Sequence, residues 1–301
     1  MTADSPLPAT ESVDPRYREL DAWPPQTALL ALWEAQLAAV AAVRPALPAL
    51  ERAAVAAAER LGRGGRLVYA GAGTSGRIAV QDGAELPPTF DWPRERLVFL
   101  MAGGPAAFIS AIENAEDDEA AARRAVEAEQ VGPDDVVLGV AASGTTRFTC
   151  ACLQAAAGRG ALTIAVGNSP GGRLLGLAAH PILVETGAEP LAGSTRLKAG
   201  TAQKVVLNLF STLVMLQLGR VHEGLMVDMR AGNDKLRARA LRMLRQLTGA
   251  GDAAAQAALA EAGGHVKLAV LLLRGLDAPA AQALLARNQS RLRAALAEIG
   301  G

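Results

Sequence analysis

The sequence predicts an α/β fold with three layers, in which a parallel sheet of about five strands is flanked by helices and followed by a small C-terminal helical bundle. Short apolar runs alternate along the chain with helical stretches. Strands that are apolar throughout are typical of a parallel sheet whose two faces are both covered. The last sixty or so residues are rich in Ala and Leu and divided by glycines, which indicates short helices.

The chain begins with a predicted helical segment, 1–60. Residues 26–61 are rich in Ala and Leu, with polar residues at helical spacing, and Pro45 and Pro48 interrupt them. Proline removes a backbone donor and disfavours the helical conformation of the residue before it. Two helices with a break between them therefore fit this segment best.

The central segment, 61–232, is predicted to hold the α/β domain. A long apolar helix follows its strands and reaches about Leu218, and a basic helix begins at Asn233. The segment 233–301 is predicted as a helical domain, with three short helices separated by the glycine-containing stretches 249–252, 263–264 and 275–279. The predicted strands are Arg66–Ala70, Leu97–Met101, Val136–Val140, Leu162–Val166 and Pro181–Val184.

The balance of charged residues indicates which kinds of binding partner electrostatics does not favour. Lys and Arg together number 30, as do Asp and Glu, so no net charge favours nucleic acid or an anionic membrane surface. We expect a small-molecule ligand instead. No run approaches the roughly 20 uninterrupted apolar residues of a membrane span, and residues 1–14 lack a signal-peptide pattern. The expected protein is soluble and cytoplasmic.

The two cysteines, Cys150 and Cys152, are separated by one residue in a predicted helix, where their side chains point to different faces. This spacing argues against a disulfide or a zinc site. Both are expected to fill the core.

Ligands of open α/β sheets gather at the carboxyl ends of the strands, and two such ends here carry glycine and hydroxyl residues. The first, Gly71–Gly76, formally matches the G-x-G-x-x-G dinucleotide pattern. That pattern expects an acidic residue at the end of the second strand, where this chain has Met101-Ala102-Gly103-Gly104. A dinucleotide is therefore disfavoured. Thr74 and Ser75, and likewise Ser143 and Thr145 after the third strand, suit a phosphate monoester instead.

Several ordered blocks resemble the N-acetylmuramic acid 6-phosphate etherases, which are built on the sugar isomerase (SIS) fold. The resemblance covers most of the chain and includes Thr10-Glu11 near its start. The blocks are Gly71–Arg77, Asp82–Phe90, Ala102–Gly104, Ala115–Asp118, Ala141–Gly144, Gly193–Lys204 and Leu225–Asp228, followed by Asn233 and Lys235-Leu236.

The resemblance implies roles for individual residues. Glu85 matches the proton donor of the family, and Glu116 matches its second active-site carboxylate. Thr74, Ser75, Ser143 and Thr145 match positions in its sugar-phosphate loops. Lys198, with Arg196 and Lys204 nearby, is a candidate to neutralise phosphate or carboxylate charge.

The sequence around Glu85 is compatible with this role. Pro87 and Pro88 follow closely and are expected to end its helix, which leaves the carboxylate near a rigid turn. Partial burial would bring its pKa towards neutrality. No metal and no cofactor are expected.

The implied reaction cleaves the D-lactyl ether of N-acetylmuramic acid 6-phosphate, as part of amino-sugar metabolism and peptidoglycan recycling. Two alternatives stay open: a non-catalytic sugar-phosphate-binding regulator, and an aldose-ketose isomerase of the same fold. A homodimer with active sites near the subunit boundary is also expected.

The chain departs from the family pattern at four places. Glu34-Ala35-Gln36 stands where the family has Glu-Asp, and Gln81 replaces an apolar residue. The family continues Ala-Ser-Gly with a Thr-Pro-Tyr type of sequence, whereas this chain has Thr145-Thr146-Arg147-Phe148. It also has Glu223-Gly224 where the family has Gly-Asn.

Overall fold

The computed structural model describes residues 8–110, 112–231 and 233–300. The chain divides into two compact units. The first comprises Met1–Ala84 with Glu95–Ser211, and the second comprises Glu85–Arg94 with Thr212–Gly301. The sequence-based boundaries after residues 60 and 232 stay predictions.

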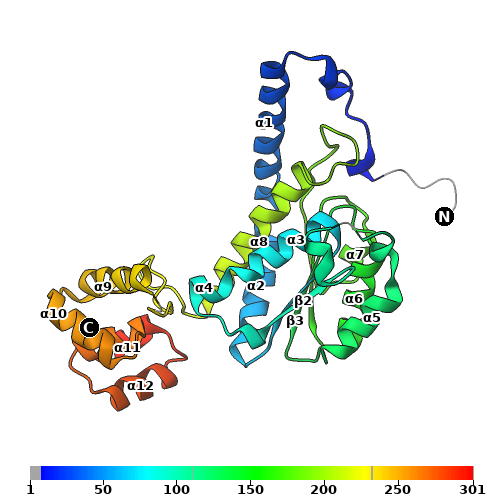
Figure 1. Ribbon diagram of the computed structural model, residues 1–301. Coiled ribbons are helices and arrows are strands. Elements are labelled where there is room, and N and C mark those ends of the chain that lie inside the picture. Colours follow the sequence, from blue (N-terminus) through cyan, green and yellow to red (C-terminus); the bar gives the residue numbers. More distant parts are fainter. Residues whose placement is uncertain (1–7, 111, 232, 301) are drawn as a thin grey trace. The chain divides into compact units, whose positions relative to one another are not determined.

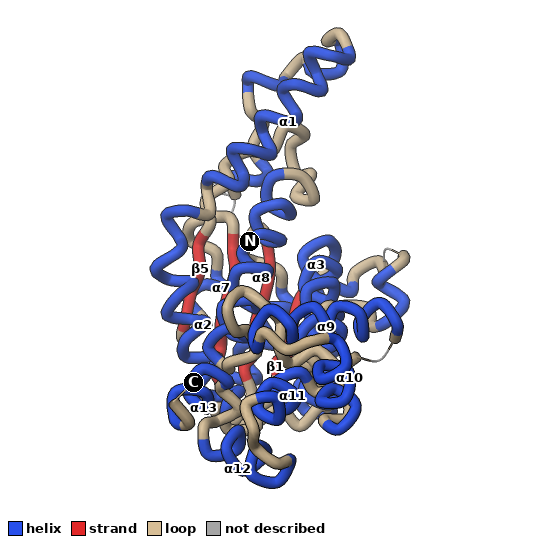
Figure 2. The backbone as a smooth tube through the Cα atoms, turned by 90° about the vertical axis from the view of Figure 1, so that its left-hand side faces the viewer, coloured by secondary structure: helices blue, strands red, loops and turns tan. Residues whose placement is uncertain are grey.

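The first unit contains one parallel sheet, whose strands are red in Figure 2. The strand order is β2-β1-β3-β4-β5. All five predicted strands are confirmed, each to within one residue at either end. Every residue of β1 and β3 is buried, which explains why these strands are apolar throughout. The strands are β1 Leu67–Gly71, β2 Leu97–Met101, β3 Val136–Ala141, β4 Leu162–Gly167 and β5 His180–Leu183.

Helices cover both faces of this sheet, as the sequence predicts. Figure 1 shows α5 (Glu119–Ala128) and α6 (Arg147–Gly158) on one side and α2 (Leu47–Gly62) on the other. The remaining helices of this unit are α1 Pro25–Ala41, α3 Gly73–Ala84, α7 Arg173–Gly176 and the first part of α8 Lys198–Gln217. The predicted break between the first two helices is confirmed, because a short 3-10 turn, Arg44–Ala46, separates α1 from α2.

The cysteines lie in α6, in the core between that helix and the sheet. Both are free and buried, which confirms their predicted role as core residues. Burial raises the pKa of the Cys152 thiol to about 12, so this side chain stays protonated and unreactive near neutral pH.

Two helical stretches, 25–62 and 198–217, are long and apolar enough by composition to cross a membrane. Polar residues interrupt both stretches, so neither is an uninterrupted apolar run of about 20 residues, but their mean hydropathy is higher than we expected from the sequence. More than half of the apolar window in α8 is buried inside the protein. In α1, by contrast, large apolar side chains remain exposed: Leu29, Leu30, Trp33, Leu37 and Val40.

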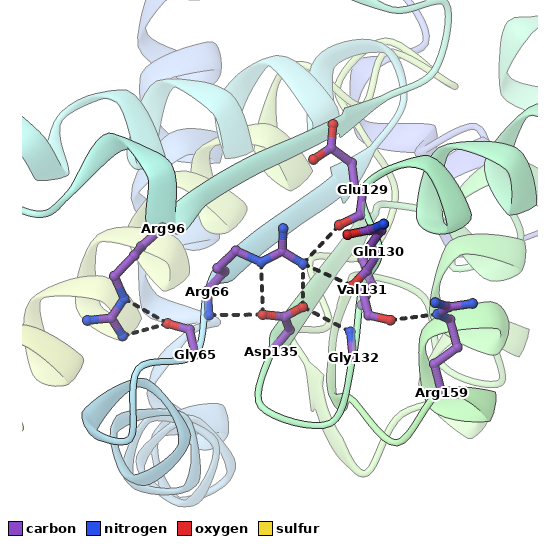
Figure 3. Close-up of polar contacts among 9 residues, drawn as sticks. All are labelled: Gly65, Arg66, Arg96, Glu129, Gln130, Val131, Gly132, Asp135 and Arg159. Carbon is purple, nitrogen blue, oxygen red and sulfur yellow. Dashed lines mark hydrogen bonds and ion pairs between the residues drawn. The ribbon is translucent and has the colours of Figure 1, made fainter.

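The amino ends of β1 and β3 are joined by an ion pair between Arg66 and Asp135 (Figure 3). The Asp135 carboxylate accepts hydrogen bonds from the Arg66 backbone N–H at 3.0 Å, from Nε at 3.1 Å and from Nη2 at 2.7 Å. It also accepts one from the Gly132 N–H at 3.0 Å. Burial alone would raise the pKa of Asp135, but these donors hold it below its ordinary value. These contacts therefore hold the amino ends of β1 and β3 together.

We expect Asp135→Asn to lower the free energy of unfolding by about 1.5–3 kcal/mol at neutral pH, the usual size for hydrogen bonds to a charged group. Because the pKa of Asp135 is lowered in the folded protein, its contribution is complete well above the ordinary value of 3.8 and is lost as the pH falls through the folded value. Urea titrations of both proteins should show a difference that shrinks below about pH 4. Asp134→Asn is the control, because that neighbouring side chain is exposed. A pH-independent difference would contradict this account.

The second unit contains the short helix α4 (Leu86–Phe90) and a C-terminal helical bundle around its own apolar core. The prediction of three short helices after the basic helix is wrong, because the structure has four in the range 249–300. The break before the fourth is made by Gln289 and Ser290, which have φ angles of 54° and 58°. It contains neither glycine nor proline, so the sequence carries no signal for it. The bundle consists of α9 Asp234–Thr248, α10 Asp252–Glu261, α11 Val266–Leu273, α12 Ala278–Arg287 and α13 Leu292–Glu298.

Candidate functional site

The first glycine loop is a tight turn between β1 and α3. A Cβ atom on Gly71 would lie 2.7 Å from the Cα of Gly76, so the strand end and the first helical turn touch through their backbones. Gly73 has a φ of 52°, which favours glycine. The turn places Thr74 and Ser75 at the start of α3. Ser75 is only 9 % exposed, and its hydroxyl makes no hydrogen bond within the described residues.

The second loop follows β3. The Oγ of Ser143 accepts hydrogen bonds from the Thr145 backbone N–H at 3.2 Å and from the Thr145 Oγ1 at 3.0 Å. A Cβ on Gly144 would lie 2.9 Å from the Cα of Gly172, so this loop also touches the loop that follows β4. Thr146, the residue before α6, forms no side-chain cap. The first N–H groups of α6 are thus left without a cap beside Ser143 and Thr145.

The two loops are neighbours in the sheet. β1 pairs with β3, and Gly71 lies opposite Val140. The structure therefore brings Thr74, Ser75, Ser143 and Thr145 to the same edge, as the sequence predicts. Hydroxyls and helix N-terminal N–H groups at one edge form an arrangement suited to a phosphate monoester.

The start of α8 lies against the first of these loops. A Cβ on Gly200 would lie 3.5 Å from the Cγ2 of Thr74. Lys198 is buried, and its Nζ donates to the Ala188 carbonyl at 2.9 Å. Burial lowers the pKa of Lys198. Its contact with a ligand stays a prediction, as do those of Arg196, which is exposed, and Lys204, which is partly buried.

Glu189 caps α8. Its carboxylate is fully buried and accepts hydrogen bonds from the backbone N–H groups of Lys198 at 2.8 Å and Ala199 at 2.9 Å. Burial raises the pKa of Glu189, and these two donors partly offset that rise. Sequence reasoning missed this residue, because it precedes the helix by nine positions and no local pattern marks it as a cap.

Glu116 lies exposed on a short 3-10 helix, Ala115–Asp117, which packs against α6. A second contact holds the chain that leads towards it: Arg77 of α3 donates to the Ala107 carbonyl at 2.9 Å and to the Ser110 carbonyl at 3.1 Å. Glu116 thus belongs to the same unit as the two loops.

Glu85 belongs to the second unit and directly precedes α4. The expectation that Pro87 and Pro88 end its helix is wrong. α3 ends at Ala84, and the two prolines lie in the first turn of α4, where a backbone N–H is not needed. The carboxylate of Glu85 is also exposed, so the expected partial burial is absent from the single chain.

Asp82 is a buried carboxylate that sequence reasoning did not single out. It is 1 % exposed and accepts hydrogen bonds from the Tyr69 hydroxyl at 2.9 Å, the Asn208 Nδ2 at 2.9 Å and the Ser211 Oγ at 3.2 Å. Burial raises its pKa. These contacts tie α3 to β1 and α8. The sequence feature that could have identified Asp82 was its position at the start of the block Asp82–Phe90, which resembles the etherase family.

Three arginines surround Glu119 beside the second loop. The Oε2 of Glu119 lies 2.7 Å from Arg123, and its Oε1 lies 3.4 Å from Arg147 and 4.0 Å from Arg173. Hydrogen bonds from Arg123 and Arg147 lower the pKa of Glu119. The carboxylate of Glu119 thus faces three guanidinium groups. Arg147 is the first residue of α6.

The described residues contain no group of three or more His, Cys, Asp or Glu side chains arranged to hold a metal ion.

Comparison with known proteins extends these observations. Residues 50–157 match the model of the glucokinase regulatory protein N-terminal SIS domain. An N-acetylmuramic acid 6-phosphate etherase of Deinococcus radiodurans is 50% identical over 96% of this chain and 95% of its own length. Its counterpart in Streptomyces avermitilis is 46% identical over 96% and 93%. That of Salmonella typhimurium is 44% identical over 95% and 97%.

Solved structures agree on the fold. A phosphoheptose isomerase of Francisella tularensis superposes with a TM-score of 0.50 at 20% identity, covering 64% of this chain and 100% of its own. A putative phosphosugar isomerase of Bacteroides fragilis gives 0.52 at 21% identity, covering 66% and 94%. The parallel sheet, the two loops at its carboxyl edge and the similarity to these proteins together define an α/β protein of the sugar isomerase (SIS) class. Within that class, the chain belongs to the N-acetylmuramic acid 6-phosphate etherase family.

Proposed function

We propose that this protein cleaves the D-lactyl ether of N-acetylmuramic acid 6-phosphate and yields N-acetylglucosamine 6-phosphate and D-lactate. The observation that carries the proposal is identity of 44–50% to etherases over nearly the whole chain. The hydroxyl loops at the carboxyl ends of β1 and β3 support it, because they suit the 6-phosphate. We further propose that the reaction occurs in the cytoplasm, during recycling of cell-wall amino sugars.

The proposed chemistry is an elimination followed by addition of water, which makes the enzyme a carbon–oxygen lyase. In the open-chain sugar, the C1 aldehyde acidifies the proton on C2. A base removes that proton, the C3–O bond breaks, and an acid protonates the departing lactate. Water then adds to C3 of the unsaturated aldehyde. Glu85 is the proposed acid, which acts as base in the second step, and Glu116 is the second carboxylate.

The direct test is incubation of the protein with N-acetylmuramic acid 6-phosphate, followed by assays for D-lactate and N-acetylglucosamine 6-phosphate. Equal amounts of both products are expected. An isomerase would convert the sugar skeleton without releasing lactate. A regulator would show a ligand-dependent rise in melting temperature without turnover. Either result would replace the proposal.

We also propose that the protein is a homodimer and that the exposed face of α1 forms part of its interface. Figures 1 and 2 show α1 extending away from the sheet. Leu29, Trp33, Leu37 and Val40 follow one another at helical spacing and are 45–69% exposed. An apolar stripe of this kind can pair with itself across a two-fold axis, so a second copy of the chain is the occupant that we propose.

Sedimentation of the wild-type protein should give about twice the chain mass of 30.9 kDa. Trp33→Asp combined with Leu37→Asp should shift it to a monomer, because two charges would be buried without partners at the interface. Glu34→Gln, an exposed change on the same helix, is the control. A fully active wild-type monomer at all concentrations would contradict the dimer. Flotation of the wild type with phospholipid vesicles would assign the same face to a membrane.

A further inference from the structure

The second unit holds a network of charged side chains around the segment that begins with Glu85. Arg220, which follows α8, is its centre. The Nη1 of Arg220 donates to the carbonyl oxygens of Phe90 at 2.6 Å and Asp91 at 3.2 Å. Its guanidinium carbon also lies 5.0 Å from the centre of the Trp92 ring, in a cation–π arrangement. One side chain thus holds the carboxyl end of α4 through three consecutive residues.

The guanidinium is anchored in turn to the helical bundle. Asp228 pairs through Oδ2 with Arg220 at 3.5 Å and through Oδ1 with Lys267 at 2.7 Å. Lys267 lies in α11, is 3 % exposed, and donates to the Ser290 carbonyl at 2.6 Å. The network therefore runs from α4 through Arg220, Asp228 and Lys267 to the turn before α13. The side chains of Arg220 and Asp228 are 18% and 19% exposed and that of Lys267 is 4% exposed, which strengthens the ion pairs among them.

The helix that Arg220 holds is short and stiff. α4 has five residues, Leu86–Phe90, and Pro87 and Pro88 restrict its first turn. At about 1.5 Å per residue, its two ends are less than 10 Å apart. Leu86, the first residue of α4, and Trp92, just after its end, are each 2 % exposed, so burial holds this segment at both ends. A displacement at its carboxyl end is therefore passed to Glu85 at its amino end.

We propose that Arg220 is a positioning residue for Glu85. It clamps the carboxyl end of α4 to the helical bundle and so fixes the direction from which the Glu85 carboxylate approaches the departing oxygen. The inference rests on the proposed role of Glu85 as the acid. It gives the C-terminal bundle a function in the reaction, because Lys267 and Asp228 hold the clamp.

The test compares Arg220→Met, which keeps much of the side-chain length and removes the donors, with Arg230→Met. Arg230 is the matched control, since it pairs with the Asp91 carboxylate at 2.7 Å but is 62% exposed and touches no backbone carbonyl of α4. Arg220→Met should lower kcat about 10- to 100-fold, because a misplacement of about 1 Å can cost 10²-fold. KM should stay within about twofold of wild type, and exchange of the C2 proton with deuterated solvent should persist. Arg230→Met should behave as wild type in all three measurements.

The outcomes separate this inference from the proposed function. Wild-type kcat in a folded Arg220→Met protein, together with an inactive Glu85→Gln protein, overturns the inference alone. Full lactate release by Glu85→Gln overturns the role of Glu85 and the inference with it. If Arg220→Met does not fold, Arg220→Lys takes its place, because its ammonium can reach one carbonyl but cannot make the whole set of contacts. Loss of kcat at wild-type KM is the expected result there too, and an unchanged kcat overturns the inference.

Discussion

Glu85→Gln should release D-lactate at least 10²- to 10⁴-fold more slowly than the wild type, the range that general acid–base assistance contributes. Glutamine preserves the shape of the side chain but cannot protonate the departing lactate. If a different group removes the C2 proton, the variant should still exchange that proton with deuterated solvent. The variant would then lose lactate release while it keeps exchange of the C2 proton. The melting temperature should stay close to that of the wild type, because the Glu85 carboxylate is exposed.

Glu261→Gln is the matched control for this measurement. Glu261 is the last residue of α10, in the same unit, and its side chain is exposed. It should be fully active. Wild-type lactate release by folded Glu85→Gln would remove Glu85 from the mechanism. Loss of both cleavage and exchange would instead identify Glu85 as the C2 base.

Ser75→Ala and Ser143→Ala should weaken substrate binding. Each removes a hydroxyl donor at the start of a helix, and a hydrogen bond to a charged group is worth about 1.5–3 kcal/mol. This corresponds to a rise of about 10- to 150-fold in the apparent dissociation constant of the 6-phosphate. Titration calorimetry with the sugar phosphate on an inactive Glu85→Gln background would measure it directly.

Ser143→Thr is the control, because threonine keeps the hydroxyl that accepts the two hydrogen bonds from Thr145. Its affinity should lie close to that of Ser143. Melting temperatures report whether the loop itself remains intact. Unchanged affinity in both alanine variants would place the phosphate elsewhere in the structure.

Much of the fold could be predicted from the sequence, because strands of a doubly covered parallel sheet must be apolar throughout. The runs Val136–Val140 and Leu162–Val166 stood out for this reason, and the structure extends each strand by one residue. The turn between α12 and α13 could not be predicted, because Gln289 and Ser290 adopt left-handed conformations that their residue types rarely signal. The prediction that Pro87 and Pro88 end the helix of Glu85 was wrong for a related reason. A proline can end one helix or begin the next, and only the geometry of Glu85 and Leu86 distinguishes the two.

The candidate site was predictable where the residues of one loop are consecutive. Gly71–Gly76 and Ser143–Thr145 each carry their chemistry within a few positions, so the pattern alone placed them at strand ends. Residues that act through distant partners left no such pattern. Asp82 meets Asn208 and Ser211 of α8 only after folding, and Arg220 meets the carbonyls of α4 only across a separation of about 130 residues.

The ion pair between Arg147 and Glu119 has a consequence for how the second loop is held. In the family pattern a proline stands in this stretch, and proline presets the backbone of a first helical turn at any ionic strength. This chain has no proline at 145–148, and its exposed Arg147 instead pairs with the partly buried carboxylate of Glu119. Such pairs weaken as counter-ions accumulate, since the Debye length falls from about 10 Å at 0.1 M salt to about 3 Å at 1 M. Order in the loop that carries Ser143 should therefore depend on salt in this protein, whereas relatives with the proline should be insensitive to it.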